Sequence, residues 1–208
     1  MDREKAEKIA TSPGSLNIMI VGVGGQGTLL ASRILGAAAL KRNYDVKVSE
    51  VHGMSQRGGS VVTYVKMGTK VHSPLIEKGE ADIIIAFEQL EALRWAEYLA
   101  DGGRIIVNTQ RIDPMPVITG KAKYPENIRA WMEVHYGNCI FIDALELAKA
   151  CGNAKTANTV IVGQLARFTG IPQGIWLEAI GETVPEKSLA VNIKAFERGY
   201  DFIAEDKA

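Results

Sequence analysis

Cysteine is scarce in this sequence. Only Cys139 and Cys151 occur among its 208 residues. A disulfide framework, a structural zinc site or a cubane iron–sulfur cluster usually needs about four cysteine or histidine side chains. We therefore expect no metal and no resident cofactor on this chain, and a reducing, cytoplasmic compartment.

The sequence also lacks a net charge and a long hydrophobic run. Lys plus Arg number 24 and Asp plus Glu number 24, so the formal net charge is zero. This balance gives no electrostatic reason to expect a nucleic acid or an anionic membrane as a partner. The apolar runs are shorter than the roughly 20 residues of a membrane span, and the charged N-terminus has no apolar core of the signal-peptide kind. We therefore expect no nucleic-acid partner and no membrane partner.

The common motifs of self-sufficient hydrolases and ATPases are absent as well. The sequence has no G-x-S-x-G nucleophile elbow, no H-E-x-x-H zinc motif and no G-x-x-x-x-G-K phosphate loop. These motifs supply a serine nucleophile, a metal site and a phosphate cradle. The chain therefore lacks the parts from which such enzymes are built.

What is present is the pattern of an α/β protein. Hydrophobic residues make up 47% and charged residues 23%, as in an ordinary globular domain. We expect a flexible leader over 1–16 and a single domain over 17–208, which is Rossmann-like, with three layers, a mostly parallel sheet and a helical C-terminal third. The expected strands are 16–21, 45–51, 60–67, 71–75, 81–87, 104–108 and 138–142, and the expected helices are 28–41, 88–99, 143–151, 156–169, 173–182 and 188–204.

The strongest local motif is the run Gly22-Val-Gly-Gly-Gln-Gly27, directly after the first expected strand and before the first expected helix. Its G-x-G-x-x-G spacing lets the backbone and a helix N-terminus approach an anionic group. A dinucleotide site also needs a carboxylate about 20 residues further on. Glu50 stands 23 residues after Gly27. Alternatively, the glycines only allow the helix to pack closely on the strand. The candidate glycine-rich loop comprises Gly22, Gly24, Gly25, Gln26 and Gly27.

A second glycine-rich loop follows the second expected strand, at residues 50–60. In a parallel sheet this loop lies near the carboxyl ends of the strands, beside the first loop, where open α/β sheets bind ligands. Arg57 can hold a phosphate or carboxylate through paired hydrogen bonds, and bare backbone amides add donors. A surface loop with an incidental arginine is the alternative. The candidate residues here are His52, Ser55, Gln56, Arg57, Gly58 and Gly59.

The two loops together resemble a known family. Residues 17–108, which contain both loops and the strand sequence Ala81-Asp-Ile-Ile-Ile-Ala-Phe-Glu88, resemble the small gamma-type domain of the 2-oxoacid:ferredoxin oxidoreductases. The likeness extends through Ala157-Asn-Thr-Val-Ile-Val-Gly163 and through 192–200. It thus covers nearly the whole chain after the leader. The 50–60 loop is its specific motif, because the glycine spacing alone occurs in many folds.

The resemblance implies a subunit of a multisubunit enzyme that is inactive without its large subunit. In this family thiamine diphosphate decarboxylates a 2-oxoacid, [4Fe-4S] clusters pass electrons to ferredoxin, and coenzyme A accepts the acyl group. In the branch that oxidises indolepyruvate, aryl pyruvates become arylacetyl-CoA. This chain has neither a cysteine set nor a Gly-Asp-Gly thiamine motif followed by Asn-Asn. Thiamine diphosphate, its Mg ion and the clusters are therefore expected on the partner, in a heterodimer or heterotetramer.

The resemblance also assigns roles to the loops. The 50–60 loop would face the partner's thiamine site, with Arg57 as an anion contact for coenzyme A or substrate and with His52, Ser55 and Gln56 as polar liners. This chain would carry no catalytic residue, and its glycine-rich loop need not bind a dinucleotide. Two alternatives remain: a stand-alone NAD(P)-binding Rossmann oxidoreductase that uses Glu50, and a nucleotide-binding adenylating domain. We also expect an apolar-centred partner surface around the helical third.

Overall fold

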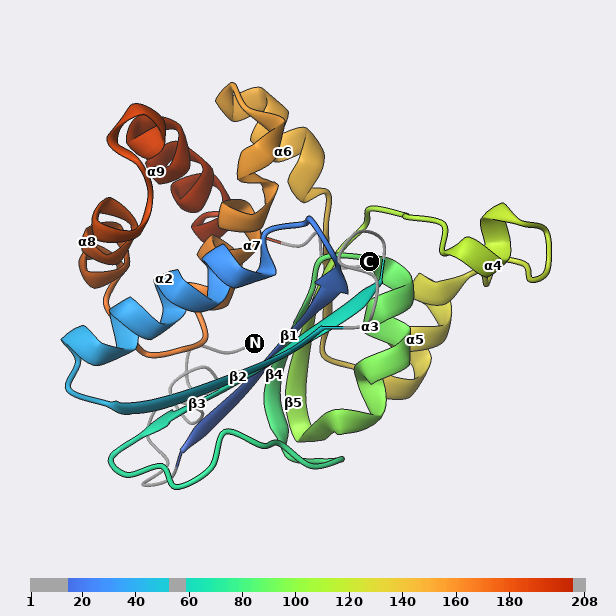
Figure 1. Cartoon of the computed structure of the whole chain (residues 1–208), viewed down its shortest axis with the longest axis horizontal. Coiled ribbons are helices and arrows are strands. Elements are labelled where there is room, and N and C mark those ends of the chain that lie inside the picture. Colours follow the sequence, from blue (N-terminus) through green and yellow to red (C-terminus); the bar gives the residue numbers. More distant parts are fainter. Residues whose placement is uncertain (1–14, 53–58, 204–208) are drawn as a thin grey trace.

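The computed structural model describes residues 15–52 and 59–203, so the expected leader lies almost entirely outside the described residues. The described chain forms a six-stranded sheet in the order β2-β3-β1-β4-β5-β6, with helices on both faces (Figure 1). The strands are β1 (Leu16–Val23), β2 (Asp45–His52), β3 (Ser60–Gly68), β4 (Ala81–Ala86), β5 (Leu99–Asn108) and β6 (Cys139–Ile142). The helices are α2 (Thr28–Lys41), α3 (Gln89–Trp95), α4 (Met115–Ile118), α5 (Ile128–Tyr136), α6 (Ala144–Cys151), α7 (Ala157–Ala166), α8 (Gln173–Thr183) and α9 (Glu186–Tyr200), with short 3-10 turns η1 (Ala96–Tyr98) and η2 (Ala154–Thr156).

The sheet is mostly parallel, as predicted. β1 pairs in parallel with β4, β4 with β5, and β5 with β6, whereas β3 runs antiparallel to both β1 and β2. β2 is therefore parallel to β1 without being its neighbour. The strand predicted at 71–75 was wrong. Pro74 has no backbone donor there, and the amide of Val71 donates instead to the carboxylate of Asp45 at 2.9 Å.

Two apolar cores, one on each face of the sheet, confirm the three-layer arrangement. Ile18 and Ile20 of β1 enter one core, and Met19 and Val21 enter the other, because successive side chains of a strand point to opposite faces. All four are fully buried, as expected for a central strand of a sheet that is covered on both faces. Helices α2, α7, α8 and α9 cover the first face, and α3 and α5 cover the second (Figure 1).

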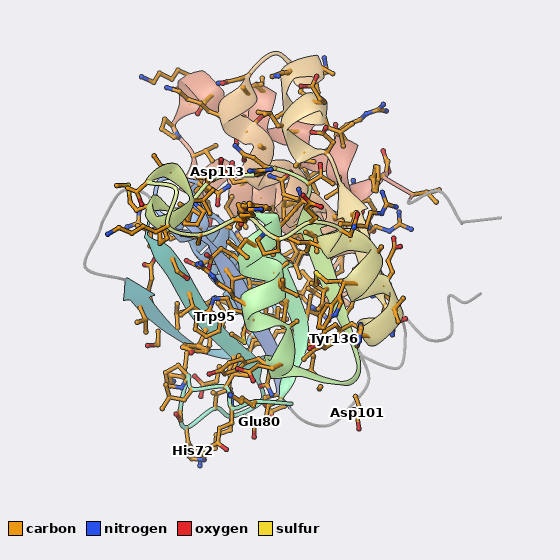
Figure 2. The ribbon with its side chains drawn as sticks, turned by 90° about the vertical axis from the view of Figure 1, so that its right-hand side faces the viewer. His72, Glu80, Trp95, Asp101, Asp113 and Tyr136 are labelled. Atoms are coloured by element: carbon orange, nitrogen blue, oxygen red, sulfur yellow. The ribbon has the colours of Figure 1, made fainter. Side chains whose placement is uncertain are left out.

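The two ends of the sheet carry different connections. Figure 2 shows Asp113 at the end where β1, β4 and β5 finish, whereas His72, Glu80 and Asp101 lie at the opposite end. β5 begins earlier than predicted, at Leu99, and its pairing with β4 is irregular between Ala81 and Ile83. The segment that follows β5 lies at the carboxyl ends of the strands, where the amide of Ile112 donates to the carboxylate of Glu88.

The C-terminal third is helical, as predicted. Its helices α7 and α9 approach so closely that two glycines are required between them. A Cβ atom on Gly163 would overlap the carbonyl oxygen of Phe196, and one on Gly199 would overlap that of Val160. α9 ends at Tyr200, four residues before the predicted end at 204. This helical pair holds the N-terminus of α7 over the edge of the sheet where the glycine-rich loop lies.

Candidate functional site

The carboxyl ends of β1, β4 and β5 meet at one edge of the sheet. Val21 of β1 is level with Ala86 of β4, which in turn is level with Val107 of β5. The glycine-rich loop follows β1, Phe87 follows β4, and Gln110 comes two residues after the end of β5. The loop therefore lies at the strand ends where open α/β sheets bind their ligands.

The glycine-rich loop has the backbone conformation for which glycine is suited. Gly25 and Gly27 have φ angles of 101° and 85°, in the left-handed region. Gly22 also has no room for a side chain, because a Cβ atom there would lie 3.1 Å from the Cβ of Phe87. The glycines thus shape a tight turn, and they also allow close packing between β1 and the residue after β4.

The side chain of Gln26 folds back into this turn. Its Oε1 accepts a hydrogen bond from the backbone amide of Val23 at 2.8 Å. Its Nε2 donates to the carbonyl oxygen of Phe87 at 2.8 Å and to Oε1 of Gln110 at 3.2 Å. Gln26 therefore ties the residues that follow β1, β4 and β5 to one another.

The two glycine-rich loops are in contact. The amide of Gly24 donates to the carbonyl oxygen of Gly59 at 2.9 Å. Next to it, Ser60 donates through its hydroxyl to the buried Glu91 at 2.5 Å, and Arg94 donates to the other oxygen of that carboxylate at 2.6 Å. The C-terminal end of the second loop is thus bonded to the first loop through Gly59 and to α3 through Ser60.

Most of the second loop lies outside the described residues. His52 is the last residue of β2 and is paired with Val61, so its backbone is at the same edge of the sheet as the glycine-rich loop. Of the other predicted residues only Gly59 is described. The remaining ones, namely Ser55, Gln56, Arg57 and Gly58, are in the part of the chain that the structure does not describe.

A cleft of about 500 Å³ opens between the glycine-rich loop and the start of α7. Lys155 is the only charged side chain among the described residues that line it, and it is exposed. Asn158 is buried beneath it, and its amide donates to the carbonyl oxygen of Gly27 at 3.4 Å. The N-terminus of α2 also faces this region, with no side-chain cap and no acidic residue in its first turn. The described lining residues are Gly24, Gly25, Gln26, Gly27, Phe87, Asn108, Gln110, Ile112, Leu145, Ala154, Lys155, Ala157 and Asn158.

The segment after β5 forms one wall of the cleft, and the buried carboxylate of Glu88 holds it in place. Glu88 is 1% exposed, and one of its oxygens accepts from the amides of Leu90 and Glu91 at the start of α3. Its other oxygen accepts from the amide of Ile112 at 3.1 Å and from the hydroxyl of Tyr124 at 2.5 Å. Burial, followed by the hydrogen bond to Glu88, raises the pKa of Tyr124, so this hydroxyl stays a donor. Glu88 thus fixes both ends of the segment that leaves the cleft at Ile112.

The position of Glu50 does not suit a dinucleotide. In the dinucleotide fold, the carboxylate that holds the ribose comes from the strand that directly neighbours β1. Here β3 lies between β1 and β2, and Glu50 is paired with Thr63 of β3. Two strand spacings, about 10 Å, therefore separate the strand of Glu50 from β1. The arrangement does not favour the NAD(P) alternative.

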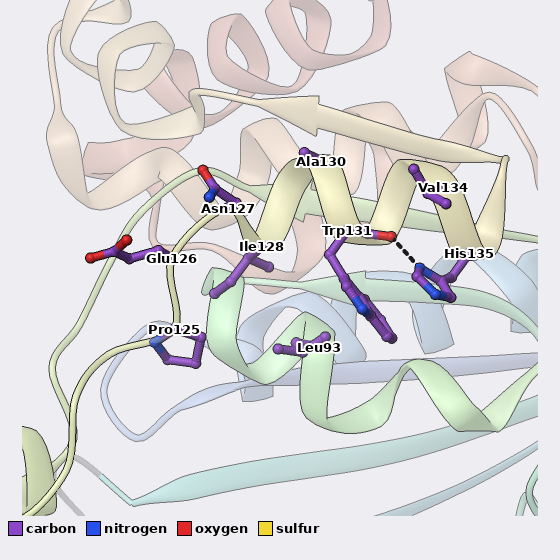
Figure 3. A pocket seen from close by; sticks show the side chains of 9 residues that line it. All are labelled: Leu93, Pro125, Glu126, Asn127, Ile128, Ala130, Trp131, Val134 and His135. Carbon is purple, nitrogen blue, oxygen red and sulfur yellow. Dashed lines mark hydrogen bonds between the residues drawn. The ribbon is translucent and has the colours of Figure 1, made fainter.

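An apolar groove of about 530 Å³ lies between α3 and α5, away from the cleft (Figure 3). Leu93 faces it from α3, and Trp131 and Val134 face it from α5, with 44% and 79% of these last two residues exposed. The ring of His135 stacks on Trp131 at 4.0 Å between centroids. We expected an apolar surface around the helical third instead. In the described part of 143–203, Ile203 is the only large apolar side chain that is exposed, because the others pack on the sheet or on one another.

Residues 15–52 and 59–203 contain neither a cluster of metal ligands nor a membrane-spanning helix. No group of three or more His, Cys, Asp or Glu side chains in these ranges could hold a metal ion. No helix there has the length and apolar character needed to cross a membrane.

Four polar or charged residues of the cleft were not predicted from the sequence: Asn108, Gln110, Lys155 and Asn158. They come from two separate segments, 108–110 and 155–158, and share no motif. Asn158 belongs to the run from Ala157 to Gly163, which contributed to the family resemblance. This was the one sequence signal that could have indicated a residue of the cleft outside the glycine-rich loops.

Comparison with known proteins agrees with the family resemblance. Residues 17–202 match the family described as pyruvate ferredoxin/flavodoxin oxidoreductase. The indolepyruvate oxidoreductase subunit IorB of Pyrococcus horikoshii is 45% identical over 188 residues, which cover 88% of this chain and 93% of that protein.

Two solved structures share the fold. The keto/oxoacid ferredoxin oxidoreductase gamma subunit of Geobacter sulfurreducens PCA is 24% identical, with a TM-score of 0.67, over 89% of this chain and 96% of that one. The 2-oxoglutarate:ferredoxin oxidoreductase of Magnetococcus marinus is 19% identical, with a TM-score of 0.67. In that case the match covers 91% of this chain but 31% of the longer chain, so the same fold there forms part of a larger polypeptide. The chain belongs to the pyruvate ferredoxin/flavodoxin oxidoreductase family and is a subunit of a 2-oxoacid:ferredoxin oxidoreductase.

Proposed function

We propose that this subunit completes an enzyme that oxidatively decarboxylates aryl pyruvates, indolepyruvate among them, to arylacetyl-CoA. The observation that carries this proposal is the 45% identity, over 93% of its length, to a relative named as an indolepyruvate oxidoreductase subunit. Two further relatives of the same name, from Thermococcus kodakarensis and Archaeoglobus fulgidus, are 44% and 43% identical. Relatives named for other 2-oxoacids are less similar, such as the 2-oxoglutarate synthase subunit KorC at 32%.

The chemistry divides between this chain and a larger partner. We place thiamine diphosphate, its Mg ion and the [4Fe-4S] clusters on that partner, in a cytoplasmic heterodimer or heterotetramer that reduces ferredoxin. The two cysteines of this chain are too few to ligate a cubane cluster. Thiamine diphosphate, when bound to the partner, would supply the carbanion chemistry of decarboxylation. Residues 17–208 of this chain would then act as one domain that completes the active-site cleft.

Within that cleft, this chain would contact coenzyme A or the substrate. Lys155 offers the exposed cation, and the uncapped N-terminus of α2 adds a positive potential at the same opening. The loop that contains His52, Ser55, Gln56, Arg57, Gly58 and Gly59 would line the side toward the partner. Support for its position comes from the hydrogen bond between Gly24 and Gly59.

The test is reconstitution with the large subunit under anaerobic conditions. Ferredoxin reduction should require both chains and coenzyme A, and kcat/KM should be highest for indolepyruvate and phenylpyruvate. A complex that uses pyruvate or 2-oxoglutarate with a higher kcat/KM would show that the aryl substrate class is wrong. Equal turnover without coenzyme A would show that the acyl acceptor is wrong.

A further inference from the structure

The glycine-rich turn after β1 has the spacing of a phosphate-binding turn, yet three of its backbone donors are already used. In a phosphate-binding turn the backbone amides and the helix N-terminus point at the anion. Here the amide of Val23 donates to Oε1 of Gln26 at 2.8 Å, and the amide of Gly24 donates to Gly59 at 2.9 Å. The amide of Gln26 itself donates to the carbonyl oxygen of Val23 at 3.2 Å. Three backbone amides of the turn, those of Val23, Gly24 and Gln26, are therefore satisfied within the protein.

The carboxamide of Gln26 occupies the inside of the turn. A Cβ atom built on Gly22 would meet its Oε1 at 3.0 Å, so the oxygen sits directly over the first glycine. This oxygen accepts from Val23 as an anionic oxygen would. The nitrogen of the same group donates to Phe87 and to Gln110, at 2.8 Å and 3.2 Å. Both ends of the amide are thus bonded, and the side chain is held by residues from three segments of the chain.

We infer that Gln26 is a built-in ligand of the glycine-rich turn and that its carboxamide excludes phosphate groups from it. A phosphate could enter only by displacing an amide that makes three hydrogen bonds. The N-terminus of α2 behind the turn has no side-chain cap and no acidic residue in its first turn. Removing the carboxamide would therefore free the backbone amide of Val23 beside an uncompensated helix N-terminus. Gln26 is then the residue that makes this turn differ from a nucleotide-binding turn, whichever 2-oxoacid the enzyme uses.

The experiment compares the full-length wild-type chain with Gln26→Ala, using ADP and inorganic phosphate as probes. The backbone amide resonance of Val23 reports binding in the turn, because Val23 donates to Gln26 and does not line the cleft. In the wild type this resonance should not move on titration with either probe. In Gln26→Ala it should move saturably, with an affinity for ADP at least about tenfold tighter than in the wild type, as expected for a new charge-assisted hydrogen bond.

Gln110→Ala is the matched control. It removes the partner of one Gln26 hydrogen bond but leaves Oε1 of Gln26 on the amide of Val23. It should gain no affinity for ADP, which separates occupancy of the turn from a general loosening of the cleft. Gln26→Ser serves in the same way as Gln26→Ala if the alanine variant does not fold.

Two results would overturn the inference. One is saturable movement of the Val23 resonance in the wild type, which would mean that the turn admits phosphate with Gln26 in place. The other is a folded Gln26→Ala or Gln26→Ser variant that binds ADP no more tightly than the wild type. Because both measurements use this chain alone, they do not depend on the substrate or on the partner.

Discussion

The amide of Gly24 donates a hydrogen bond to the carbonyl oxygen of Gly59 at 2.9 Å. This bond joins two loops that are far apart in the sequence, one after β1 and one before β3. β3 makes the contact possible, because it returns antiparallel beside β1 and brings Ser60 level with Val23. The bond therefore fixes the backbone of Gly24 relative to that of Gly59.

Arg57→Ala should weaken coenzyme A binding in the reconstituted enzyme. If Arg57 holds an anionic group through charge-assisted hydrogen bonds, its loss should raise KM for coenzyme A by about tenfold or more, or lower turnover to a similar extent. The far-ultraviolet circular dichroism and melting temperature of the chain should not change. Arg42→Ala, an exposed arginine at the end of α2, is the charge-matched control and should leave KM unchanged. Unaltered kinetic constants in Arg57→Ala would remove the role proposed for this residue.

Lys155→Ala should also raise KM for coenzyme A, by a smaller factor. The side chain is exposed, so its attraction for an anion is screened by water and is worth about 1 kcal/mol, or roughly fivefold. The effect should shrink as salt is added, since screening acts on exposed charges. Lys121→Ala provides the comparison, because Lys121 is exposed but does not line the cleft. An effect of Lys155→Ala that is independent of salt would argue against a direct charge contact.

Gly163→Ala should destabilise the chain, because its methyl group would overlap the backbone of α9 at Phe196. Forcing these helices apart should lower the free energy of unfolding by about 1 to 3 kcal/mol. Gly36→Ala is the matched substitution in α2, where a methyl group meets no atom within 4 Å. It should instead stabilise the chain by about 0.5 to 1 kcal/mol, as alanine does in an open helix position. Urea unfolding of both variants measures the difference, and equal effects would mean that the α7–α9 contact is not close.

Cys139 should react slowly with alkylating reagents at neutral pH. Burial is the main cause that raises the pKa of its thiol to about 11. Since the thiolate is the reactive form, roughly one thiol in a thousand would be ionised at pH 8. The alkylation rate should therefore still rise about tenfold per pH unit between pH 7 and pH 9.5. Mass spectrometry of a Cys151→Ala variant, in which Cys139 is the remaining cysteine, follows this rate. A plateau below about pH 9 would show that the thiol is not shielded.

Local sequence patterns predicted much of the fold and part of the site. The apolar run of β1 indicated a strand buried on both faces, and Ile18 and Met19 do enter opposite cores. The glycine spacing predicted a tight turn, and Gly25 and Gly27 have positive φ angles there. These features depend on neighbouring residues, so a short stretch of sequence is enough to specify them.

Features that depend on distant residues could not be predicted in this way. β3 is the neighbour of β1 because residues 60–67 pair with residues 16–23. Neither strand has a sequence feature that specifies this pairing. Lys155 and Gln110 line the same cleft only because the strand ends and α7 meet there. Gln26 stands at one of the x positions of G-x-G-x-x-G, where the motif allows any residue. Its role inside the turn is therefore shown only by its contacts with Val23 and Phe87.

The most direct test of the account is anaerobic co-purification of the tagged chain from its native host. We predict a brown complex that contains a larger, cysteine-rich, thiamine-binding chain and that reduces ferredoxin with aryl pyruvates and coenzyme A. The absorbance of the eluate and the identity of the co-purified chain establish this in one preparation. A colourless protein that elutes without a partner and binds NADH would contradict both the subunit role and the exclusion of nucleotides by Gln26.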